Sequence, residues 1–250
     1  MLTEERHRII LDLLKAKGTI KIQEITELTE ASESTIRRDL TQLEEEKFLK
    51  RVHGGASILQ GKLKELTVSE KTSKNLHGKT AIARYAASLI EEGDCIFLDA
   101  GTTTLGMIDF LPEIDIVVVT NGLTHVDALL QKGIQTYITG GSVKPTTKAM
   151  IGSGAVEAIQ KYRFDKAFLG TNGVHPQYGY TTPDPEEAQV KRTAIELSRE
   201  AIVLADDSKF GEIAFSKIAD LEKAVVITNG SEDVPDSAYV KQTTVKVVTA

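Results

Sequence analysis

The sequence predicts two unequal units, a small helical unit with a β-ribbon followed by a larger α/β unit built on a parallel sheet. Before residue 45, apolar side chains recur at helical spacing in three successive stretches. After residue 79, short uninterrupted apolar runs alternate with helical stretches, which is typical of a parallel sheet covered on both faces. Between them, residues 60–78 are polar and show no sustained periodicity. We therefore expect domains at 1–59 and 79–250, joined by a linker at 60–78.

Composition limits the classes of protein that fit. The chain has 250 residues, 41% of them hydrophobic, which is enough for a substantial core. Its net charge of −6 is unlike that of a polycation that coats nucleic acid. A single cysteine, Cys95, excludes an internal disulfide, and the histidines show no ligand spacing, so we expect no metal and no cofactor. We find no signal-peptide pattern and no run near the ~18 apolar residues of a membrane span, and we expect a soluble, cytoplasmic protein.

The first unit should contain three helices. Thr3 is expected to cap the first helix, and Lys17-Gly18 to end it with a cation and a glycine. Ser32 or Ser34 can cap the third by accepting free backbone N–H groups. The inward apolar positions of the three helices are Ile9, Ile10, Leu13 and Leu14, then Ile20, Ile22, Ile25 and Leu28, then Ile36, Leu40 and Leu43. This order places a helix-turn-helix at residues 20–45, with the third helix in the recognition position.

The outward face of the third helix fits a DNA major groove. Thr35, Arg37 and Arg38 fall off the apolar stripe; arginines can reach guanine edges or phosphates, and hydroxyls can bond to several bases. For an isolated arginine pair, an ordinary solvated face is the alternative interpretation. A two-stranded ribbon over 48–58, turning at Gly54-Gly55, then forms a wing.

Charge supports a DNA contact only locally. Residues 1–60 hold ten basic and eleven acidic side chains, but five of the basic ones lie between Arg37 and Arg51. Phosphate contacts there would dominate the affinity and make it salt-sensitive. His53 could add a phosphate bond, although a solvated histidine on the wing fits equally well. The residues we expect to contact double-stranded DNA are Ser34, Thr35, Arg37, Arg38, Lys50, Arg51 and His53.

This unit resembles the N-terminal domain of the DeoR family of bacterial transcription regulators. The matching residues run from Ser34 to Leu40, continue at Leu43-Glu44, and resume from Leu49 to Ala56. The resemblance implies a DNA-binding repressor with a winged helix-turn-helix. Because one small winged helix rarely gives enough affinity alone, we expect paired or repeated operators and a dimer or tetramer.

The larger unit should form a doubly wound α/β sheet. Its apolar runs predict strands at 95–98, 116–119, 136–138, 166–169, 201–205, 225–227 and 245–248. Helical spacing predicts helices at 81–92, 124–131, 153–161 and 186–200, and one more after Thr104. In such sheets ligands bind just past the carboxyl ends of the strands. Polar, glycine-containing turns follow five of the strands, at 99–104, 120–122, 140–141, 170–173 and 206–211.

The turn at 99–104 is the best candidate for binding a phosphate. Gly101 lets the backbone approach an anion, the following helix offers free N–H groups, and three threonines add hydroxyl donors. The pattern Asp99-x-Gly101-Thr102-Thr103 also resembles the phosphate loop of sugar kinases and actin-like ATPases, but there a strand follows and here we expect a helix. The sequence Gly-x-x-x-x-Gly-Lys-Ser/Thr of P-loop nucleotidases does not occur, so we do not expect a nucleotide-driven enzyme.

The same turns match the C-terminal sensor domain of the DeoR family, which is similar to ribose-5-phosphate isomerase and glucosamine-6-phosphate deaminase. The match covers 99–103, 120–121, 140–141, 165–170, 184–191 and 206–210. Within the family, segments 73–77, 168–175 and 181–185 look closest to repressors of fructose-utilisation operons. That resemblance implies release from the operator by fructose 1-phosphate. Spacing and composition show only that an anionic, hydroxyl-rich small molecule would fit.

Two sets of residues are expected at the effector site. Those expected to hold the phosphate are Gly101, Thr102, Thr103, Thr104 and Lys209, and those expected to hold the sugar are Asp99, Asn121, Thr171, Asn172, Glu187 and Lys191. Glu187 and Lys191 lie four residues apart on one predicted helix, so a simple surface pair is the alternative for them.

Two other functions stay open. A sugar-phosphate isomerase or deaminase would need a carboxylate or lysine to abstract a proton next to a carbonyl, which Asp99, Glu187 or Lys191 could supply. Asn172, however, places an amide at a position where such an enzyme could use an acidic catalytic residue. We therefore expect no catalytic residue. The other alternative keeps the regulator and changes its effector, for example to tagatose 6-phosphate.

Overall fold

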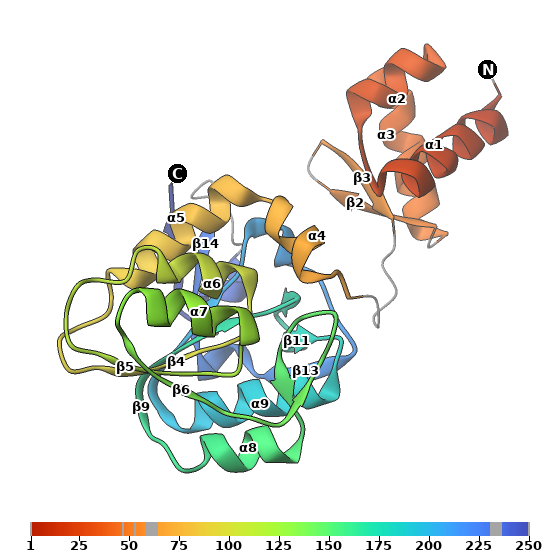
Figure 1. Ribbon diagram of the computed structural model, residues 1–250. Coiled ribbons are helices and arrows are strands. Elements are labelled where there is room, and N and C mark those ends of the chain that lie inside the picture. The colour runs from red at the N-terminus through yellow and green to blue at the C-terminus, as the bar shows by residue number, and fades with distance from the viewer. Residues whose placement is uncertain (1, 47, 53, 59–64, 231–236, 250) are drawn as a thin grey trace. The chain divides into compact units, whose positions relative to one another are not determined.

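The computed structural model describes residues 2–46, 48–52, 54–58, 65–230 and 237–249 (Figure 1). The chain divides into two compact units, Met1–Gly61 and Lys62–Ala250. Each unit encloses hydrophobic clusters of its own. None of the helices in these ranges combines the length and the apolar character needed to cross a membrane.

The first unit packs three helices against a small antiparallel sheet. The helices are α1 (Thr3–Lys17), α2 (Ile22–Thr29) and α3 (Glu33–Glu45). The strands, in their order across the sheet, are β1 (Thr19–Lys21), β3 (Gly55–Ile58) and β2 (Leu49–Val52). The side chains that fill the space between them include Ile10, Ile25, Ile36 and Leu40, which are completely buried. The predicted helix-turn-helix and wing are therefore present, with a third strand that the sequence pattern did not predict.

That third strand explains where the first unit differs from expectation. Ile20 belongs to β1 and not to α2. The ribbon turns at Gly54, whose φ is 76°, whereas Gly55 is already paired with Val52 inside the sheet. A Cβ on Gly55 would stand 2.0 Å from the carbonyl oxygen of Ile20, so β1 can approach only a glycine. Thr3 does not cap α1 either; it is the first helical residue, and Leu2 precedes it as the N-cap.

The second unit is built on a seven-stranded parallel sheet, as predicted. In order across the sheet, its strands are β15 (Val245–Val248), β14 (Val225–Asn229), β12 (Ser198–Leu204), β9 (Phe164–Gly170), β4 (Cys95–Leu98), β5 (Val117–Thr120) and β6 (Gln135–Ile138). Every neighbouring pair is parallel. The central strands are buried on both faces, which is why they appear in the sequence as uninterrupted apolar runs.

Helices cover both faces of this sheet (Figure 1). Successive residues of β4 point to opposite faces: Ile96 and Leu98 join one hydrophobic cluster, and Phe97 joins the other. The helices on the Ile96 face are α5 (Leu76–Ala87), α6 (Thr102–Ile108) and α7 (Leu123–Gln131). Those on the Phe97 face are α8 (Ser153–Ile159) and α9 (Pro185–Glu196).

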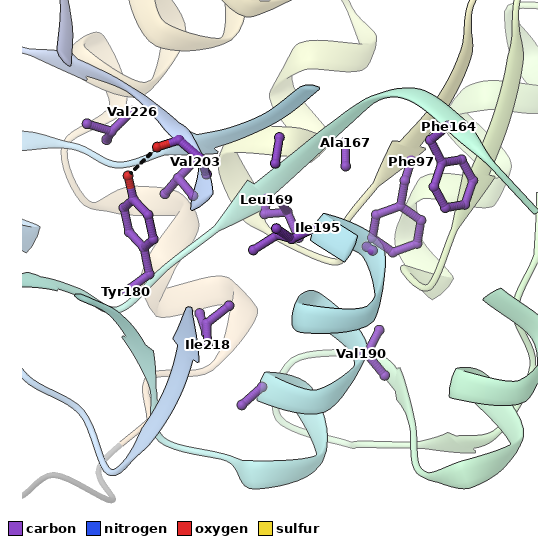
Figure 2. Packing of buried hydrophobic residues seen from close by; sticks show 14 of the residues in the cluster. Phe97, Phe164, Ala167, Leu169, Tyr180, Val190, Ile195, Val203, Ile218 and Val226 are labelled. Atoms are coloured by element: carbon purple, nitrogen blue, oxygen red, sulfur yellow. Dashed lines mark hydrogen bonds between the residues drawn. The ribbon is translucent and has the colours of Figure 1, made fainter. Parts of the chain in front are cut away.

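A small antiparallel sheet enlarges the cluster on the Phe97 face. Its strands are β10 (Gly173–His175), β11 (Gly179–Thr182) and β13 (Ser216–Ala219). Figure 2 shows Tyr180 of β11 in this cluster beside Val203 and Val226, with its hydroxyl donating to the carbonyl oxygen of Ala224 at 2.8 Å. Burial raises the pKa of Tyr180, so the phenol stays protonated and keeps this bond.

Several boundaries in the second unit differ from the expected ones. Helix α4 (Val68–Ser73) and the start of α5 lie within 60–78, where we expected a linker, and α5 ends at Ala87 instead of residue 92. The helix expected at 186–200 ends at Glu196, and β12 begins two residues later. Ser198 pairs with Phe164 of β9, so sheet pairing outweighs the helical preference of this stretch. A two-residue ladder joins β7 (Ser142–Val143) to β8 (Met150–Ile151), which was also not expected.

The strand order reverses between β4 and β9. From β4 the chain passes outward through β5 to β6, then returns to β9 on the other side of β4 and passes outward to β15. In doubly wound sheets, ligands bind in the crevice outside the carboxyl ends of the strands at such a reversal. Asp99 follows β4 and Gly170 ends β9, so both lie at this point.

Candidate functional site

The first turn of α3 presents a group of linked hydroxyls. Ser32 is the N-cap, and its Oγ accepts the backbone N–H of Thr35 at 3.3 Å. The side-chain oxygens of Ser34 and Thr35 each lie 2.9 Å from the same Ser32 Oγ. Ser34 is exposed and Thr35 is half-buried. The hydroxyls predicted to contact DNA therefore stand together at the start of the recognition helix.

The two arginines of α3 are exposed, whereas the aspartate that follows them is buried. Arg37 Nη2 lies 3.3 Å from Glu33 Oε2, an exposed i,i+4 pair worth about 0.3–0.5 kcal/mol, so Arg37 and Arg38 both remain available to DNA. Asp39 accepts from Arg6 Nε at 2.7 Å and from Arg6 Nη2 at 3.0 Å. These bonds fasten α1 to α3 and raise the pKa of Arg6. Asp39 thus holds the recognition helix in place, a role that the sequence pattern did not reveal.

The basic residues of the wing differ in how they are held. Arg51 donates through Nη1 to Thr41 Oγ1 at 2.9 Å, and its backbone N–H donates to Glu44 Oε1 at 2.8 Å. This side chain therefore ties β2 to α3 and does not extend freely toward a ligand. Lys50, the preceding residue of β2, is half-buried. His53 lies outside the described residues.

A buried ion pair stands at the reversal of the large sheet. Lys191 of α9 donates to Asp99 Oδ2, and their side chains are 7% and 3% exposed. The same carboxylate oxygen accepts the backbone N–H of Gly170 at 3.0 Å, and Lys191 also donates to the Gly170 carbonyl oxygen at 3.1 Å. Two residues expected to hold the sugar are therefore brought together, joining the ends of β4 and β9 to α9.

Two other expected effector residues hold the loop after β4 in place. The buried Thr104 hydroxyl donates to the Asp99 carbonyl oxygen and accepts the backbone N–H of Gly101 at 3.0 Å. Asn121 Oδ1 accepts the N–H of Ala100 at 3.0 Å, and its Nδ2 donates to a backbone carbonyl at 3.1 Å. The polar side-chain atoms of Thr104 and Asn121 form hydrogen bonds within the protein, and these bonds shape the loop.

His125 supports the same loop from α7. Its ring is 1% exposed, and its Nε2 lies 3.2 Å from Thr104 Oγ1. Because the Thr104 hydroxyl donates to backbone carbonyls, we assign the ring proton to Nε2, which then donates to Oγ1. Burial lowers the pKa of His125 to about 4. A Cβ on Gly122 would stand 2.3 Å from Nδ1, so the ring requires glycine at that position.

A lysine side chain lies beside the first residues of α6. Lys79 of α5 places Nζ 3.4 Å from Thr102 Oγ1. Burial lowers the pKa of Lys79, and the ammonium groups of Lys209 and two other lysines lower it further, although Asp206 opposes them. Thr103, the next residue of α6, is also buried. An anion at this end of the sheet would relieve the repulsion between the lysines. Lys209 was expected here, whereas Lys79 was not.

Glu187 and Lys191 are both buried, and they pair with other residues and not with each other. Glu187 Oε1 lies 3.2 Å from Lys144 Nζ, and Lys144 also pairs with Asp184 Oδ2 at 2.7 Å. Burial opposes the charge of Lys144, but its carboxylate partners raise its pKa well above the usual range. The alternative of a simple surface pair between Glu187 and Lys191 does not hold, because both side chains are buried and each pairs with a different residue.

Thr171 and Asn172 lie in the turn between β9 and β10. The Thr171 hydroxyl donates to the carbonyl oxygens of Gly173 and Thr181, both at 2.9 Å. Asn172 Oδ1 accepts from Thr182 Oγ1 at 3.1 Å, and within the described residues its amide nitrogen has no hydrogen-bond partner. Asn172 therefore retains donors for a ligand, whereas Thr171 is used by the turn.

Two hollows of the surface lie away from these residues. One is lined by residues such as Gly93, Ile116 and Gly133, and the other by residues such as Arg199 and Ala224, all near the amino ends of the strands. Neither contains the charged groups described above, so we base the site on the carboxyl ends of the strands. Within the described ranges, no group of three histidine, cysteine or acidic side chains could hold a metal ion.

Comparison with known proteins covers both units. A model of the DeoR-like helix-turn-helix domain matches residues 6–62, and a model of the DeoR C terminal sensor domain matches residues 74–230. The chain is 57% identical to the "Uncharacterized HTH-type transcriptional regulator FruR" of Bacillus subtilis (strain 168) over 99% of each chain. It is 35% identical to the HTH-type transcriptional repressor GlcR of the same organism, over 96% of this chain and 92% of that one.

Two further similarities are more distant. The chain is 32% identical to the lactose phosphotransferase system repressor of Staphylococcus epidermidis (strain ATCC 12228 / FDA PCI 1200), over 90% of each chain. Among solved structures, ribose 5-phosphate isomerase A from Methanocaldococcus jannaschii aligns over 55% of each chain, with 19% identity and a TM-score of 0.42. That structural likeness is too weak to support an inference about function.

Proposed function

The chain belongs to the DeoR family of DNA-binding transcription regulators, and on that premise we propose that it represses a sugar-utilisation operon and leaves its operator when a sugar phosphate binds the second unit. Fructose 1-phosphate is the effector we place first, and another ketose phosphate is the alternative. The relatives are named as regulators and repressors, which supports a regulator and not an enzyme. One of those names refers to the lactose phosphotransferase system.

One observation carries the proposal: cationic and neutral donors converge where the large sheet reverses. Lys79 lies near the first residues of α6, where Thr102 and Thr103 offer backbone N–H groups and hydroxyls, and the charge of Lys209 acts on Lys79. An incoming phosphate would receive charge-assisted hydrogen bonds there, which are about twice as strong as neutral ones. We therefore assign the phosphate of the effector to this end of the site.

The hydroxyls of the sugar are assigned to the charged groups on the other side of the same loop. Asp99 and Glu187 are carboxylates that accept from hydroxyls, and Lys191 donates to them. Asn172 adds amide donors. A sugar hydroxyl both donates and accepts, so it fits a site in which buried carboxylates and ammonium groups alternate. Gly101, Thr104, Asn121 and Thr171 shape this site, and we assign them no direct contact through their side chains.

The DNA contact is assigned to α3. Donors stand at the exposed residues Ser34, Arg37 and Arg38. The half-buried Thr35 adds a hydroxyl, and Lys50 of the wing adds a cation. Arginines read guanine edges or hold phosphates, and the hydroxyls at the start of the helix add phosphate or base contacts. We expect the operator to contain repeated half-sites and the protein to bind it as a dimer or tetramer.

The test is a gel-shift titration on the protein's own promoter region, with and without ligands. The panel contains fructose 1-phosphate, fructose 6-phosphate, tagatose 6-phosphate, unphosphorylated fructose and inorganic phosphate. A thermal-shift series on the same panel reports binding itself, because a ligand of the folded state raises its Tm by mass action. We expect one ketose phosphate to raise the Tm and to weaken operator binding. If none of the phosphorylated sugars did either, the effector assignment would be wrong.

A further inference from the structure

Glu65 is a buried carboxylate at the start of the second unit. It lies four residues beyond Gly61, where the first unit ends. Its side chain is 7% exposed, and two ammonium groups share it: Lys71 Nζ lies 2.9 Å from Oε1, and Lys144 Nζ contacts Oε2. Although burial alone would raise the pKa of Glu65, the charges of Lys71 and Lys144 lower it. Glu65 is therefore ionised, and it anchors the chain just after the first unit.

The backbone beyond Glu65 is held by the same loop that carries Lys144. The N–H of Val68 donates to the carbonyl oxygen of Thr146 at 3.1 Å. Thr67 caps the helix that begins there, and its own N–H donates to Glu70 Oε2 at 2.8 Å. The segment 65–68 is thus fixed to the loop 144–147 by one ion pair and one backbone hydrogen bond.

Lys144 also belongs to the effector site proposed above. Its Nζ lies 2.7 Å from Asp184 Oδ2 and 3.2 Å from Glu187 Oε1, in addition to its contact with Glu65. An ammonium group has three N–H donors, and here three carboxylates share them. A ligand oxygen that accepts from Lys144 must therefore displace one of the three carboxylates.

Glu65 is the carboxylate that can leave at least cost. Within the described ranges, Lys144 is the one cation paired with Asp184 and with Glu187, although Asp184 also accepts two backbone N–H groups and Glu187 accepts the Thr147 hydroxyl. Glu65 has a second cation, Lys71. Taking the cation away from a carboxylate that has no second one is unfavourable, so Glu65, which keeps Lys71, should separate from Lys144 first. Separation of Glu65 from Lys144 would therefore release a side chain only four residues beyond the end of the first unit.

We propose that Lys144 couples the effector site to the connection between the two units: an oxygen of the bound sugar phosphate takes the ammonium group from Glu65 and loosens segment 65–68 from loop 144–147. The proposal rests on the proposed function, because it places the effector beside Glu187. The empty and occupied states then differ in a named contact, and such a difference is what allosteric coupling requires.

The decisive variant is Glu65→Gln, which keeps the shape of the side chain and removes its charge. Without any ligand, we expect Glu65→Gln to bind the promoter fragment at least about fivefold more weakly than the wild type, the lower end of typical allosteric coupling. Glu157→Gln, on the exposed face of α8, is the matched control and should bind like the wild type. Promoter binding by Glu65→Gln at wild-type strength would overturn the proposal, and this result needs no knowledge of the effector.

Thermodynamic linkage predicts that the same variant, which should bind DNA more weakly, binds the effector more tightly. Because Glu65 competes with the effector for Lys144, Glu65→Gln should bind fructose 1-phosphate more tightly by about the factor that it loses on DNA. Its promoter affinity should also respond less to that ligand. A variant that merely damaged the fold would bind the ligand more weakly. If the wild type itself did not bind fructose 1-phosphate, the effector assignment would fail, while the promoter comparison would still decide the role of Glu65.

Hydrogen exchange keeps the proposal testable if Glu65→Gln does not fold. In the wild type, fructose 1-phosphate should speed amide exchange in residues 66–71 while leaving α8 unchanged. Unchanged exchange of 66–71 in a protein saturated with that ligand would contradict the release of Glu65.

Discussion

Asp99 and Lys191 lie 92 residues apart in the sequence and form an ion pair that is almost completely buried where the large sheet reverses. Asp99 directly follows β4, Lys191 belongs to α9, and both form hydrogen bonds with Gly170 at the end of β9. The pair therefore connects β4, β9 and α9 at the point where a doubly wound fold binds its ligand. Its two charges are also the polar groups that we assign to the sugar.

Removing one partner of this pair should cost much more than removing both. Lys191→Met leaves the Asp99 carboxylate buried without its cation, and we expect the free energy of unfolding to fall by about 3–5 kcal/mol. The double variant Asp99→Asn with Lys191→Met should recover a large part of that loss. Urea denaturation of the wild type, both single variants and the double variant measures the coupling. If the losses in the free energy of unfolding of the two single variants added up to that of the double variant, the interaction between Asp99 and Lys191 would contribute little to stability.

The exposed arginines of α3 should determine DNA binding. Arg37→Ala and Arg38→Ala should each weaken operator binding by about 1–3 kcal/mol where the side chain reads a base, and relax specificity at that position. If the side chain contacts a phosphate instead, its removal should reduce the slope of log binding constant against log salt concentration by about one. Arg8→Ala, exposed on α1, is the control. Equal losses for all three variants would argue against α3 as the recognition helix.

Asp39 should matter for folding and not for direct contact with DNA. Asp39→Asn removes the charge that holds Arg6, and hydrogen bonds to charged groups contribute about 1.5–3 kcal/mol. We expect a loss of this size in the free energy of unfolding of the first unit, with operator affinity within about threefold of the wild type while that unit stays folded. Glu27→Gln, exposed on α2, controls for the change in charge. A folded Asp39→Asn protein that failed to bind the operator would show that Asp39 acts at the DNA surface.

The large sheet could be predicted from the sequence because its strands are buried on both faces. Runs such as Cys95–Leu98 consist of apolar residues for that reason, and their spacing along the chain shows the alternation with helices. Strand β1 could not be predicted in this way. It is three residues long, and it exists because Gly55, far along the chain, admits its backbone. Tertiary contact, and not local preference, makes it a strand.

The site could be predicted where it depends on turns and not where it depends on side chains from distant segments. Asp99, Glu187 and Lys191 stand in motifs that the family resemblance identifies. Lys144 stands in no such motif, and it becomes important only because the fold places it against Glu65, 79 residues away, and against Glu187. Sequence spacing pairs Glu187 with Lys191, whereas the structure gives each of them a partner from another element.

His125 should make the stability of the second unit depend on pH. Its pKa is about 4 in the folded protein and near 6.5 when unfolded, so between those values the unfolded chain binds the proton and the folded chain does not. The free energy of unfolding should therefore fall as the pH is lowered from 6.5 to 4, by up to about 3 kcal/mol from this residue. Urea denaturation at pH 7 and pH 5 should show a smaller change in His125→Gln, whose amide can still reach Thr104. An unchanged pH dependence in that variant would contradict the burial of a neutral ring.

Thr103 provides the sharpest test of the phosphate end of the effector site, because Thr103→Val removes a hydroxyl without changing the shape of the side chain. A hydrogen bond to a charged group contributes about 1.5–3 kcal/mol, so the variant should bind the sugar phosphate about 10- to 100-fold more weakly. It should consequently stay on its operator at ligand concentrations that release the wild type. Thr193→Val is the matched control, since that hydroxyl bonds within α9 to the carbonyl oxygen of Gln189. Isothermal titration calorimetry and operator release should change together in Thr103→Val and stay unchanged in Thr193→Val. Normal release by Thr103→Val would move the phosphate away from the start of α6.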